Sequence, residues 1–367
     1  MGHIISIFHT TQYSPPNQTV RSNTARQRLE HLLRANHANV AIIHCSGTPN
    51  LFLQHLPVLY LLEVSASQLL NIYDQTLLNE YAWQPSPSVI IKNNWKIFLG
   101  KKEYAEAYKR YFDDELIYMG GNQLQTTKIY AQELLAISLF SGDTYSTIHL
   151  GLAFILKSQE MTSQALASMC LHIQKIHLLS QKTEINKWSH GVYTLQKLLL
   201  EIAEKKEITN ITNDLQSLTE KESMYISQYI SKWDGRDYYK SLKEIEETTL
   251  LLAITTSESI ILPFISIFNA SQAISILSKN KVLLDSHISL SFQALLFHIL
   301  LNYISLGMPC IQLEKLDQYP LVNIKTIKSD SRLAFFNTEK LLAIYHLDMI
   351  KEISFKEKAI SAIYHSK

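Results

Sequence analysis

Apolar residues recur at intervals of three and four along much of this chain, which is the period of an amphipathic α-helix. Between residues 52 and 75 five positions keep this spacing: Leu59, Leu62, Ala66, Leu69 and Tyr73. The neighbouring positions Val58, Tyr60, Leu61 and Val64 make the first turns apolar on nearly every side. A helix that is apolar all round lies inside a protein, so a buried helix is predicted over 52–75.

The same pattern continues on both sides of this segment. Further helices are predicted over residues 24–36, 89–99, 102–116, 123–140, 144–157, 162–179 and 331–351, and a long buried pattern runs from 248 to 306. Glycine and proline number only 10 and 9, which favours helices joined by short connections over sheets and long loops. The prediction is an all-α fold, a single large multi-helix domain of antiparallel helices around one elongated core.

Three regions are expected along the chain. Residues 1–21, with Pro15 and Pro16, are predicted to be an irregular arm, and 22–367 the helical domain. Within that domain, residues 181–247 carry more charge than the rest and are expected at its periphery, because a charge run is commonly a solvated helix face.

Two weakly charged stretches call for a membrane test. Thr248–Lys279 contains a single internal acid and is split by Pro263, and Ser286–Pro309 contains no Asp, Glu, Lys or Arg. Both are rich in polar uncharged residues, whereas a spanning helix needs about 20 predominantly apolar ones. We interpret both as buried helices, with a membrane-associated protein as the weaker alternative.

The charge and the cysteine content of the chain argue against several classes of protein. Lys and Arg total 34 and Asp and Glu total 33, a net charge of +1, so no broad field favours nucleic acid or an anionic membrane. The three cysteines, Cys45, Cys170 and Cys310, lie far apart and indicate neither a metal site nor a disulfide framework. The first residues do not have the pattern of a signal peptide, and a cytoplasmic location is expected.

Several polar residues are candidates for chemistry. His55 precedes Pro57, which is expected in the first helical turn, so His55 should lie near the unpaired N–H groups of a helix start. Its position alone favours a histidine bonded to a loop carbonyl over a ligand. His172 and His177 are five apart and are expected on an exposed helix face, and the cluster from Asp113 to Glu115 has no visible partner carboxylate.

Five stretches, taken in order, are similar to motifs of one known family. They are QHLPVLYLLEVSASQLLNIYDQ (54–75), NNWKIFLGKKEYAEAYKRYFDDEL (93–116), SGDTYSTIHLGLAFIL (141–156), LPFISIFNASQAISIL (262–277) and FNTEKLLAIYH (336–346). Together they resemble the questin oxidase-like proteins, and the order and approximate spacing hold from about residue 36 to 346.

The resemblance implies an all-helical oxidoreductase, of the monooxygenase kind, that acts on an apolar aromatic or polyketide-like molecule in a buried cavity. It also implies NADPH for some members, and non-haem iron held by several histidines and a modified lysine. Imidazole suits iron, and ring cleavage requires open coordination positions inside an apolar pocket.

Carried over residue by residue, the family pattern is only partly kept. His55 matches the first histidine, and Lys340 matches the lysine. The other presumed histidine positions hold Tyr145, Ser266 and Asn337, which are poor ligands for divalent iron compared with imidazole.

Other residues could form a substitute metal site. Tyr145 and His149 are four residues apart, so they share one face of a helix. His298 lies in a helix predicted to be buried. The hypothesis takes His55, His298 and Lys340 as metal ligands, with Tyr145 and His149 as altered catalytic residues. The alternative makes His149 and His298 satisfied core histidines and Lys340 a surface or snorkelling lysine.

Two functions follow. The first is a questin oxidase-like oxidoreductase, possessing non-haem iron and NADPH if the family chemistry is kept. The second is a non-catalytic helical protein that retains the scaffold and binds an apolar ligand or a partner protein. The oligomeric state is not specified by the sequence.

Overall fold

The computed structural model describes residues 23–44, 47–77, 81–173, 191–205, 208, 211–212, 215, 217–350 and 353–366. Regular structure in these residues consists of fifteen α-helices and four short 3-10 helices. The β pairing found in them is limited to two isolated bridges, Ile43 with Pro49 and Tyr193 with Trp233. The predicted all-α fold is confirmed.

The first half of the chain forms seven α-helices and two 3-10 helices. They are α1 (Asn23–Asn39), α2 (Phe52–Leu61), α3 (Ala66–Leu77), η1 (Trp95–Phe98), η2 (Lys102–Tyr104), α4 (Ala105–Tyr118), α5 (Gln123–Phe140), α6 (Thr144–Leu156) and α7 (Gln159–His172). The second half forms α10 (Leu195–Lys205), α11 (Glu220–Lys232), α12 (Tyr238–Thr255), α13 (Leu262–Lys279), α14 (Asp285–Ser305), η3 (Leu313–Asp317), α15 (Ile324–Lys328), η4 (Ser331–Phe335), α16 (Thr338–Met349) and α17 (Lys356–His365).

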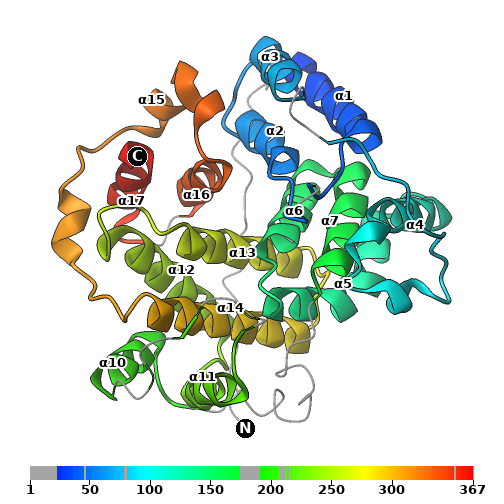
Figure 1. Cartoon of the computed structure of the whole chain (residues 1–367). Helices are drawn as coiled ribbons and strands as arrows, with labels where there is room; N and C mark the ends of the chain where they lie inside the picture. Colours follow the sequence, from blue (N-terminus) through cyan, green and yellow to red (C-terminus); the bar gives the residue numbers. More distant parts are fainter. Residues whose placement is uncertain are drawn as a thin grey trace, which may run out of the picture.

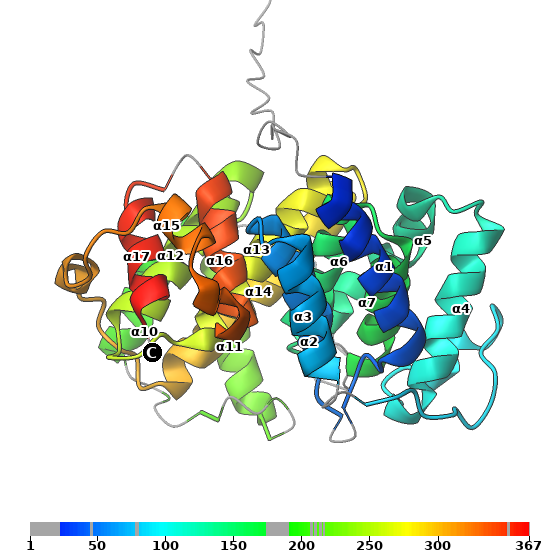
Figure 2. The same ribbon diagram turned by 90° about the horizontal axis from the view of Figure 1, so that it is seen from above.

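Helix α13 lies at the centre of the molecule and joins its two sides. It packs against α6, α12, α14 and α16, and nearly all of its residues after the first turn are buried. Helices α1 to α7 lie on one side of α13, and α15 to α17 lie on the other, as both views show (Figures 1 and 2). The buried apolar side chains form one core cluster that includes residues from both sides.

The helix predicted over 52–75 is two helices. Glu63 has a positive φ of 68°, which ends α2, and Ser65 then begins α3. The Ser65 hydroxyl accepts from the Gln68 N–H, and the Gln68 side chain accepts from the Ser65 N–H. This reciprocal arrangement is a capping box, and its Ser-x-x-Gln pattern was a sequence signal for a new helix start.

Other predicted boundaries also shift. Residues 89–94 are not helical, and only Trp95–Phe98 forms a 3-10 turn, because the apolar Val89 and Ile91 are exposed instead of packed. The helix predicted over 331–351 is divided at Phe336 and Asn337 into η4 and α16. The helix predicted to reach residue 179 ends at His172, since Ile173 is extended, and residues 174–179 lie outside the described residues. Helix α17 was not predicted.

The charged segment, 181–247, includes α10, α11 and the first part of α12. Helices α10 and α11 lie at one edge of the molecule and pack against α14 (Figure 1). Helix α12 continues past this segment, and its part from Thr248 to Thr255, where the buried pattern was predicted to return, is fully buried. Residues 181–190 of this segment lie outside the described residues.

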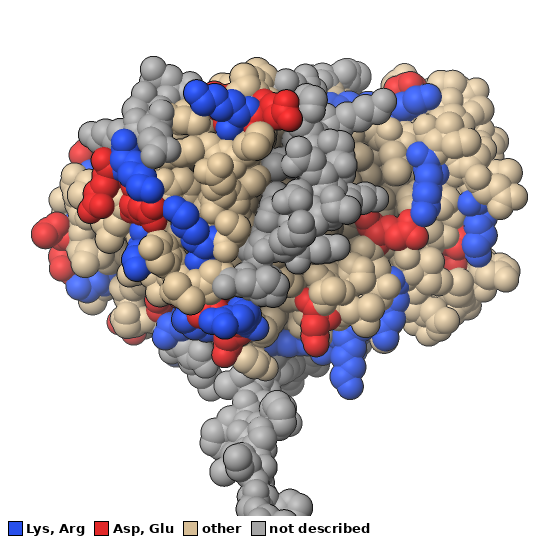
Figure 3. Space-filling model, turned by 90° about the horizontal axis from the view of Figure 1, so that it is seen from below, with Lys and Arg blue, Asp and Glu red and all other residues tan. Residues whose placement is uncertain are grey.

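One helix in the described part of the chain is long and apolar enough to cross a membrane. It is α14, and 78% of its apolar window is buried inside the protein. Burial against α5, α11, α12 and α13 therefore accounts for its composition. On the face in Figure 3, acidic and basic side chains are interspersed.

Candidate functional site

The first turn of α16 is the meeting point of several residues that the sequence singled out. Asn337 is the N-cap of this helix, and its side-chain oxygen accepts hydrogen bonds from the N–H groups of Glu339 (2.9 Å) and Lys340 (3.1 Å). Asparagine is among the best N-cap residues because it satisfies N–H groups that have no partner in the helix. The oxygen of Asn337 is therefore occupied by the helix itself.

His55 reaches the same turn from α2. Its Nε2 lies 3.1 Å from the carbonyl oxygen of Ala334, so Nε2 carries the proton and donates. The hydroxyl of Thr338 donates to Nδ1 at 2.9 Å. Burial lowers the pKa of His55, which keeps the ring neutral in this role. Both ring nitrogens are thus engaged, and His55 lies within α2 rather than ahead of it.

Ser266 approaches from α13. Its hydroxyl donates to Oε1 of Glu339 at 2.5 Å, and the side-chain amide of Asn269 donates to the Glu339 carbonyl at 2.9 Å. His346 in turn donates from Nδ1 to the Asn269 oxygen at 3.2 Å. Burial raises the pKa of the Glu339 carboxyl, because a charged carboxylate is poorly solvated there.

Lys340 faces a different hollow from Glu339. A cavity of about 600 Å³ is lined by Lys340 and Asn337 together with Phe335, Phe336 and Leu262 among others. Burial lowers the pKa of Lys340. Lys340 is buried, so it is not a surface lysine, and the snorkelling alternative stays a prediction.

His149 and His298 each bond a neighbouring helix. Nε2 of His149 lies 3.3 Å from the side-chain oxygen of Gln164 in α7. Nε2 of His298 donates to the carbonyl of Leu139 in α5 at 2.8 Å. Burial lowers the pKa of each ring to about 4, so both are neutral at physiological pH.

These contacts do not fit an iron centre built from the predicted residues. His55 has no ring nitrogen left for a metal, Asn337 caps a helix, and Ser266 is bonded to Glu339. In the described part of the chain, no group of three or more His, Cys, Asp or Glu side chains is arranged to hold a metal ion. The ligand roles of His55, His298 and Lys340 stay predictions.

The larger of the cavities beside this turn has a volume of about 740 Å³. One part of its lining is Pro49, Leu51 and Phe52 at the start of α2, and another is the α5–α6 turn. His172 lines it from the end of α7, and Glu339 from α16. Apolar and titratable groups therefore share one space, which is typical of a small-molecule site.

Tyr145 is held firmly in the wall of this cavity. Its hydroxyl donates to the carbonyl of Asn50 at 2.6 Å, and its own carbonyl accepts from the Gln54 side chain at 2.9 Å. Its ring is nearly parallel to that of His149, with an interplanar angle of 7° and centroids 5.9 Å apart. Tyr145 and His149 therefore share one helix face, as predicted. Their rings stack on each other and do not form a pair of metal ligands.

Asp143 and His172 form a pair that sequence reasoning missed. Asp143 is the N-cap of α6, with Oδ1 accepting from the Ser146 N–H and Oδ2 from the Ser138 hydroxyl. Nδ1 of His172 lies 2.8 Å from the carbonyl of Ser168 and 3.7 Å from Oδ2 of Asp143. The expected exposure of His172 is wrong, since its side chain is only 13% exposed. The sequence indicates that Asp143 caps a helix, because aspartate follows a turn glycine there. It does not indicate that Asp143 lies near His172.

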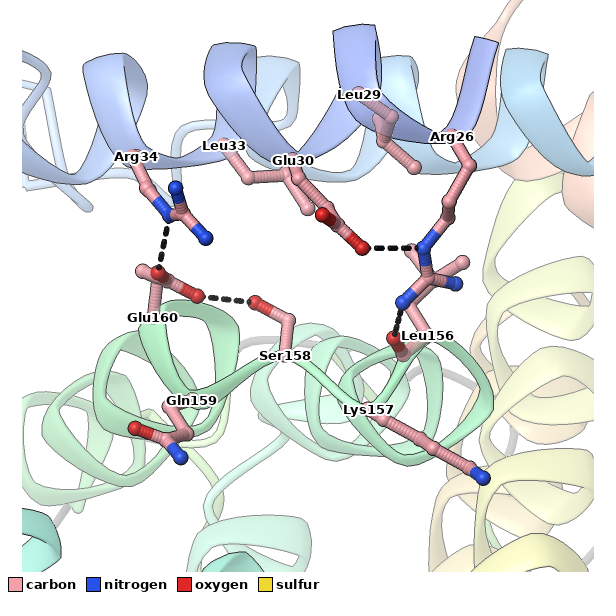
Figure 4. Close-up of a pocket in the computed structure, with 10 residues that line it drawn as sticks. All are labelled: Arg26, Leu29, Glu30, Leu33, Arg34, Leu156, Lys157, Ser158, Gln159 and Glu160. Atoms are coloured by element: carbon pink, nitrogen blue, oxygen red, sulfur yellow. Dashed lines mark hydrogen bonds and ion pairs between the residues drawn. The ribbon is translucent and has the colours of Figure 1, made fainter. Parts of the chain in front are cut away.

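A third, smaller cavity of about 260 Å³ lies between α1 and the α6–α7 turn (Figure 4). Its arginines and glutamates already have partners. Arg26 bonds Glu30 and the carbonyl of Leu156, and Arg34 pairs with Glu160. These contacts tie α1 to the turn, and they leave the larger cavity as the stronger candidate for a ligand site.

Comparison with protein families gives a match that spans the helices from α2 to α16. The family model of questin oxidase-like proteins matches residues 49–350. The match covers most of the chain, which therefore belongs to the questin oxidase-like family. The resemblance seen in the sequence is confirmed, and membership supports an oxidoreductase-like function at the level of the family. A search of the curated proteins found no match.

Proposed function

We propose that this chain is an oxidoreductase whose substrate is an apolar aromatic, polyketide-like small molecule bound in the 740 Å³ cavity. The observation that carries the proposal is the lining of that cavity. Its volume lies in the range of about 300–1,000 Å³ that small-molecule sites occupy. Family membership supplies the reaction class.

The two kinds of lining suit two features of such a molecule. Pro49, Leu51 and Phe52 offer an apolar surface for a flat ring system. Asp143, His172 and Glu339 offer groups that can exchange protons or hydrogen bonds with ring hydroxyl and carbonyl substituents. A purely apolar hydrocarbon could make no hydrogen bond to these groups, which disfavours it as a ligand.

A second candidate is a non-catalytic member of the family that binds the same class of molecule. It is favoured by the polar atoms of His55, Ser266 and Asn337, which are all used in bonds that hold α16 in place. Iron and NADPH stay predictions from the family resemblance, and no step is derived through them. A cytoplasmic location and the lack of nucleic-acid or membrane partners are likewise proposed, not observed.

Binding is tested with 1,8-dihydroxyanthraquinone as the probe, by titration calorimetry on the full chain. We expect binding to wild type and at least a tenfold loss in Leu51→Trp, because the larger ring takes up part of the space that the probe needs. Leu200→Trp is the matched control, since Leu200 is exposed on α10 and outside the cavity. Absence of binding to wild type, or equal affinity of both variants, would contradict the proposal.

Turnover separates the two candidates. The protein is incubated with the probe, NADPH and dioxygen, with and without added Fe(II), and the products are analysed by mass spectrometry. An oxygenated product that is lost in Leu51→Trp supports the oxidoreductase. Binding without any product supports the non-catalytic member. Metal analysis of the purified protein tests the iron prediction separately.

A further inference from the structure

We propose that Glu339 is a neutral carboxylic acid that donates a hydrogen bond from Oε2 to a carbonyl oxygen of the bound aromatic molecule. Ser266 is its positioning residue. This inference rests on the proposed function, since it requires a ligand in the 740 Å³ cavity that Glu339 lines. It adds a residue that recognises the ligand, and it restricts the ligand class to aromatic molecules with a ring carbonyl group.

The first turn of α16 directs the side chain of Glu339 toward this cavity. Consecutive residues of an α-helix point in directions about 100° apart. Lys340 lines the 600 Å³ cavity, whereas Glu339 lines the 740 Å³ cavity and neither the 600 Å³ nor the 260 Å³ cavity. The backbone of Glu339 is bonded within the protein, because its N–H donates to Asn337 and its carbonyl accepts from Asn269. The side chain is therefore left to border the cavity.

The two carboxyl oxygens of Glu339 have different surroundings. Oε1 accepts from the Ser266 hydroxyl at 2.5 Å, so the proton of the neutral acid is on Oε2. Oε2 has no hydrogen-bond partner among the described residues, and it is not one of their fully buried unpartnered atoms. Because Glu339 is only partly buried, Oε2 keeps accessible surface that a ligand in the cavity can reach. An O–H group at this atom is placed to donate to a ligand oxygen.

The surroundings of Glu339 favour the acid over the carboxylate. Burial raises the pKa of the carboxyl, and the hydrogen bond from Ser266 lowers it by less. In the described residues no cation adds to that lowering. Helix α13, which provides Ser266, has a single charged side chain, Lys279 at its other end. A carboxylic acid that is kept neutral in this way can act as a hydrogen-bond donor to a carbonyl group.

Other titratable groups surround the cavity. They are His44, Asp143, Tyr145 and His172 in its lining, and His55 and Lys340 beside it. The Tyr145 hydroxyl already donates to a backbone carbonyl, and both oxygens of Asp143 accept bonds that cap or precede α6. The unpartnered nitrogen of His172 is fully buried. Glu339 differs from these three residues in having an unpartnered polar atom that is accessible.

The interaction breaks no bond and needs no oxidant. The proton stays on Oε2 and is shared with the carbonyl oxygen of the ligand. Electron density in the ligand moves toward that oxygen, so the carbonyl carbon becomes a better acceptor of a nucleophile or a hydride. The same hydrogen bond therefore orients the ligand and activates its carbonyl group.

The test compares 9-fluorenone with fluorene, which have the same ring system and differ in one carbonyl group. Their affinities for the full chain are measured by equilibrium dialysis at pH 5. We expect wild type to prefer fluorenone by about fivefold, the effect of one hydrogen bond. Glu339→Gln should keep this preference, because its side-chain N–H donates and its oxygen can accept from Ser266. Glu339→Leu should lose it, while the affinity for fluorene changes by less than about threefold.

The dependence on pH distinguishes a hydrogen-bond donor from a residue that only shapes the cavity. The acid loses its proton as the pH rises through the native pKa of Glu339. The preference of wild type for fluorenone should therefore fall between pH 5 and pH 8. Neither probe titrates in this range, and His44, Asp143 and His172 are unchanged in Glu339→Gln. The preference of this variant should stay constant.

Glu314→Leu is the matched control, because Glu314 is exposed in η3 and outside the cavity. Far-ultraviolet circular dichroism checks folding, and the pH comparison with Glu339→Gln carries the test if Glu339→Leu does not fold. Equal affinity of wild type for both rings, or an undiminished preference in folded Glu339→Leu, would overturn the inference but leave the ligand site intact. A preference that rises with pH would overturn it too. Failure of fluorenone, fluorene and the anthraquinone to bind would refute the site and the donor together.

Discussion

Gly151 of α6 lies so close to Ala273 of α13 that a Cβ on Gly151 would be 2.7 Å from the Cβ of Ala273 and 2.9 Å from its Cα. Real Cβ atoms are not found at such distances, so the absence of a side chain at 151 sets how near the two helices approach. Helix α6 carries Tyr145 and α13 carries Ser266. This crossing therefore fixes the distance between α6, which lines the larger cavity, and α13, whose Ser266 bonds Glu339.

Gly151→Ala should destabilise the protein despite the better helix propensity of alanine. Overpacking of a core lowers the free energy of unfolding by about 1–3 kcal/mol. Replacing a helical glycine by alanine raises it by roughly 1 kcal/mol. We expect a net loss of about 1 kcal/mol in the free energy of unfolding, measured by urea denaturation. The double variant with Ala273→Gly moves the methyl group to the other helix, and it should be more stable than the sum of the two single changes. Strict additivity would show that the contact is not what limits the approach.

Asn337→Ala should lower the free energy of unfolding by about 1 kcal/mol, because the N–H groups of Glu339 and Lys340 lose their acceptor. Asn337→Asp is the matched control, since aspartate accepts the same bonds and is equally favoured at an N-cap. Thermal or urea unfolding of the three proteins measures the effect. If the aspartate variant lost as much stability as the alanine variant, Asn337 would not act through its cap.

Helix boundaries were predictable where a capping residue or a turn glycine marks them. Gly120 and Gly121, both with positive φ, end the segment before α5, and Asp143 begins α6. The prediction failed over 89–99, where the apolar Val89 and Ile91 of the expected first turn face solvent. Periodicity cannot reveal whether an apolar face has a neighbour to pack against.

The candidate site was harder to predict, because its contacts join residues far apart in the sequence. The family resemblance located Ser266 and Asn337. Nothing in the sequence showed that Ser266 would bond the Glu339 carboxyl, or that Asn337 would accept from the Glu339 N–H. His172 was set aside because it has no partner at helical spacing, and its partner Asp143 comes from another helix. Spacing rules describe one helix at a time, whereas this cavity lies between several.

His298→Gln should reduce the sensitivity of the fold to acid. Burial lowers the pKa of His298 from 6.5 to about 4. Between these values the unfolded chain takes up a proton at this position and the folded chain does not, so the free energy of unfolding falls as the pH falls. The contribution is at most about 1.4 kcal/mol per pH unit.

The glutamine can still donate to the Leu139 carbonyl but does not titrate. Urea unfolding between pH 7 and pH 4 should therefore give a shallower slope for this variant than for wild type. The exposed His31→Gln serves as the control and should keep the wild-type slope. Equal slopes in all three proteins would mean that His298 takes up its proton in the folded state.

Glu339→Gln should have the opposite dependence on pH. Burial raises the pKa of this carboxyl above its ordinary value of 4.5, so the folded protein holds a proton that the unfolded chain has already released. The free energy of unfolding therefore falls as the pH rises from about 4.5 through the native pKa, and the loss is complete above it. Glutamine is neutral at every pH and keeps an oxygen that can accept from Ser266. The stability of the variant relative to wild type should increase between pH 4 and pH 8.

Glu314→Gln provides the comparison, because Glu314 is exposed in η3 and should show no such trend. Both variants are measured by urea unfolding across this range, and only the difference from wild type is used, so that the buried histidines cancel. A constant offset for Glu339→Gln at all pH values would mean that the carboxyl ionises normally in the fold. A trend of the reverse sign would mean that the anion is stabilised there.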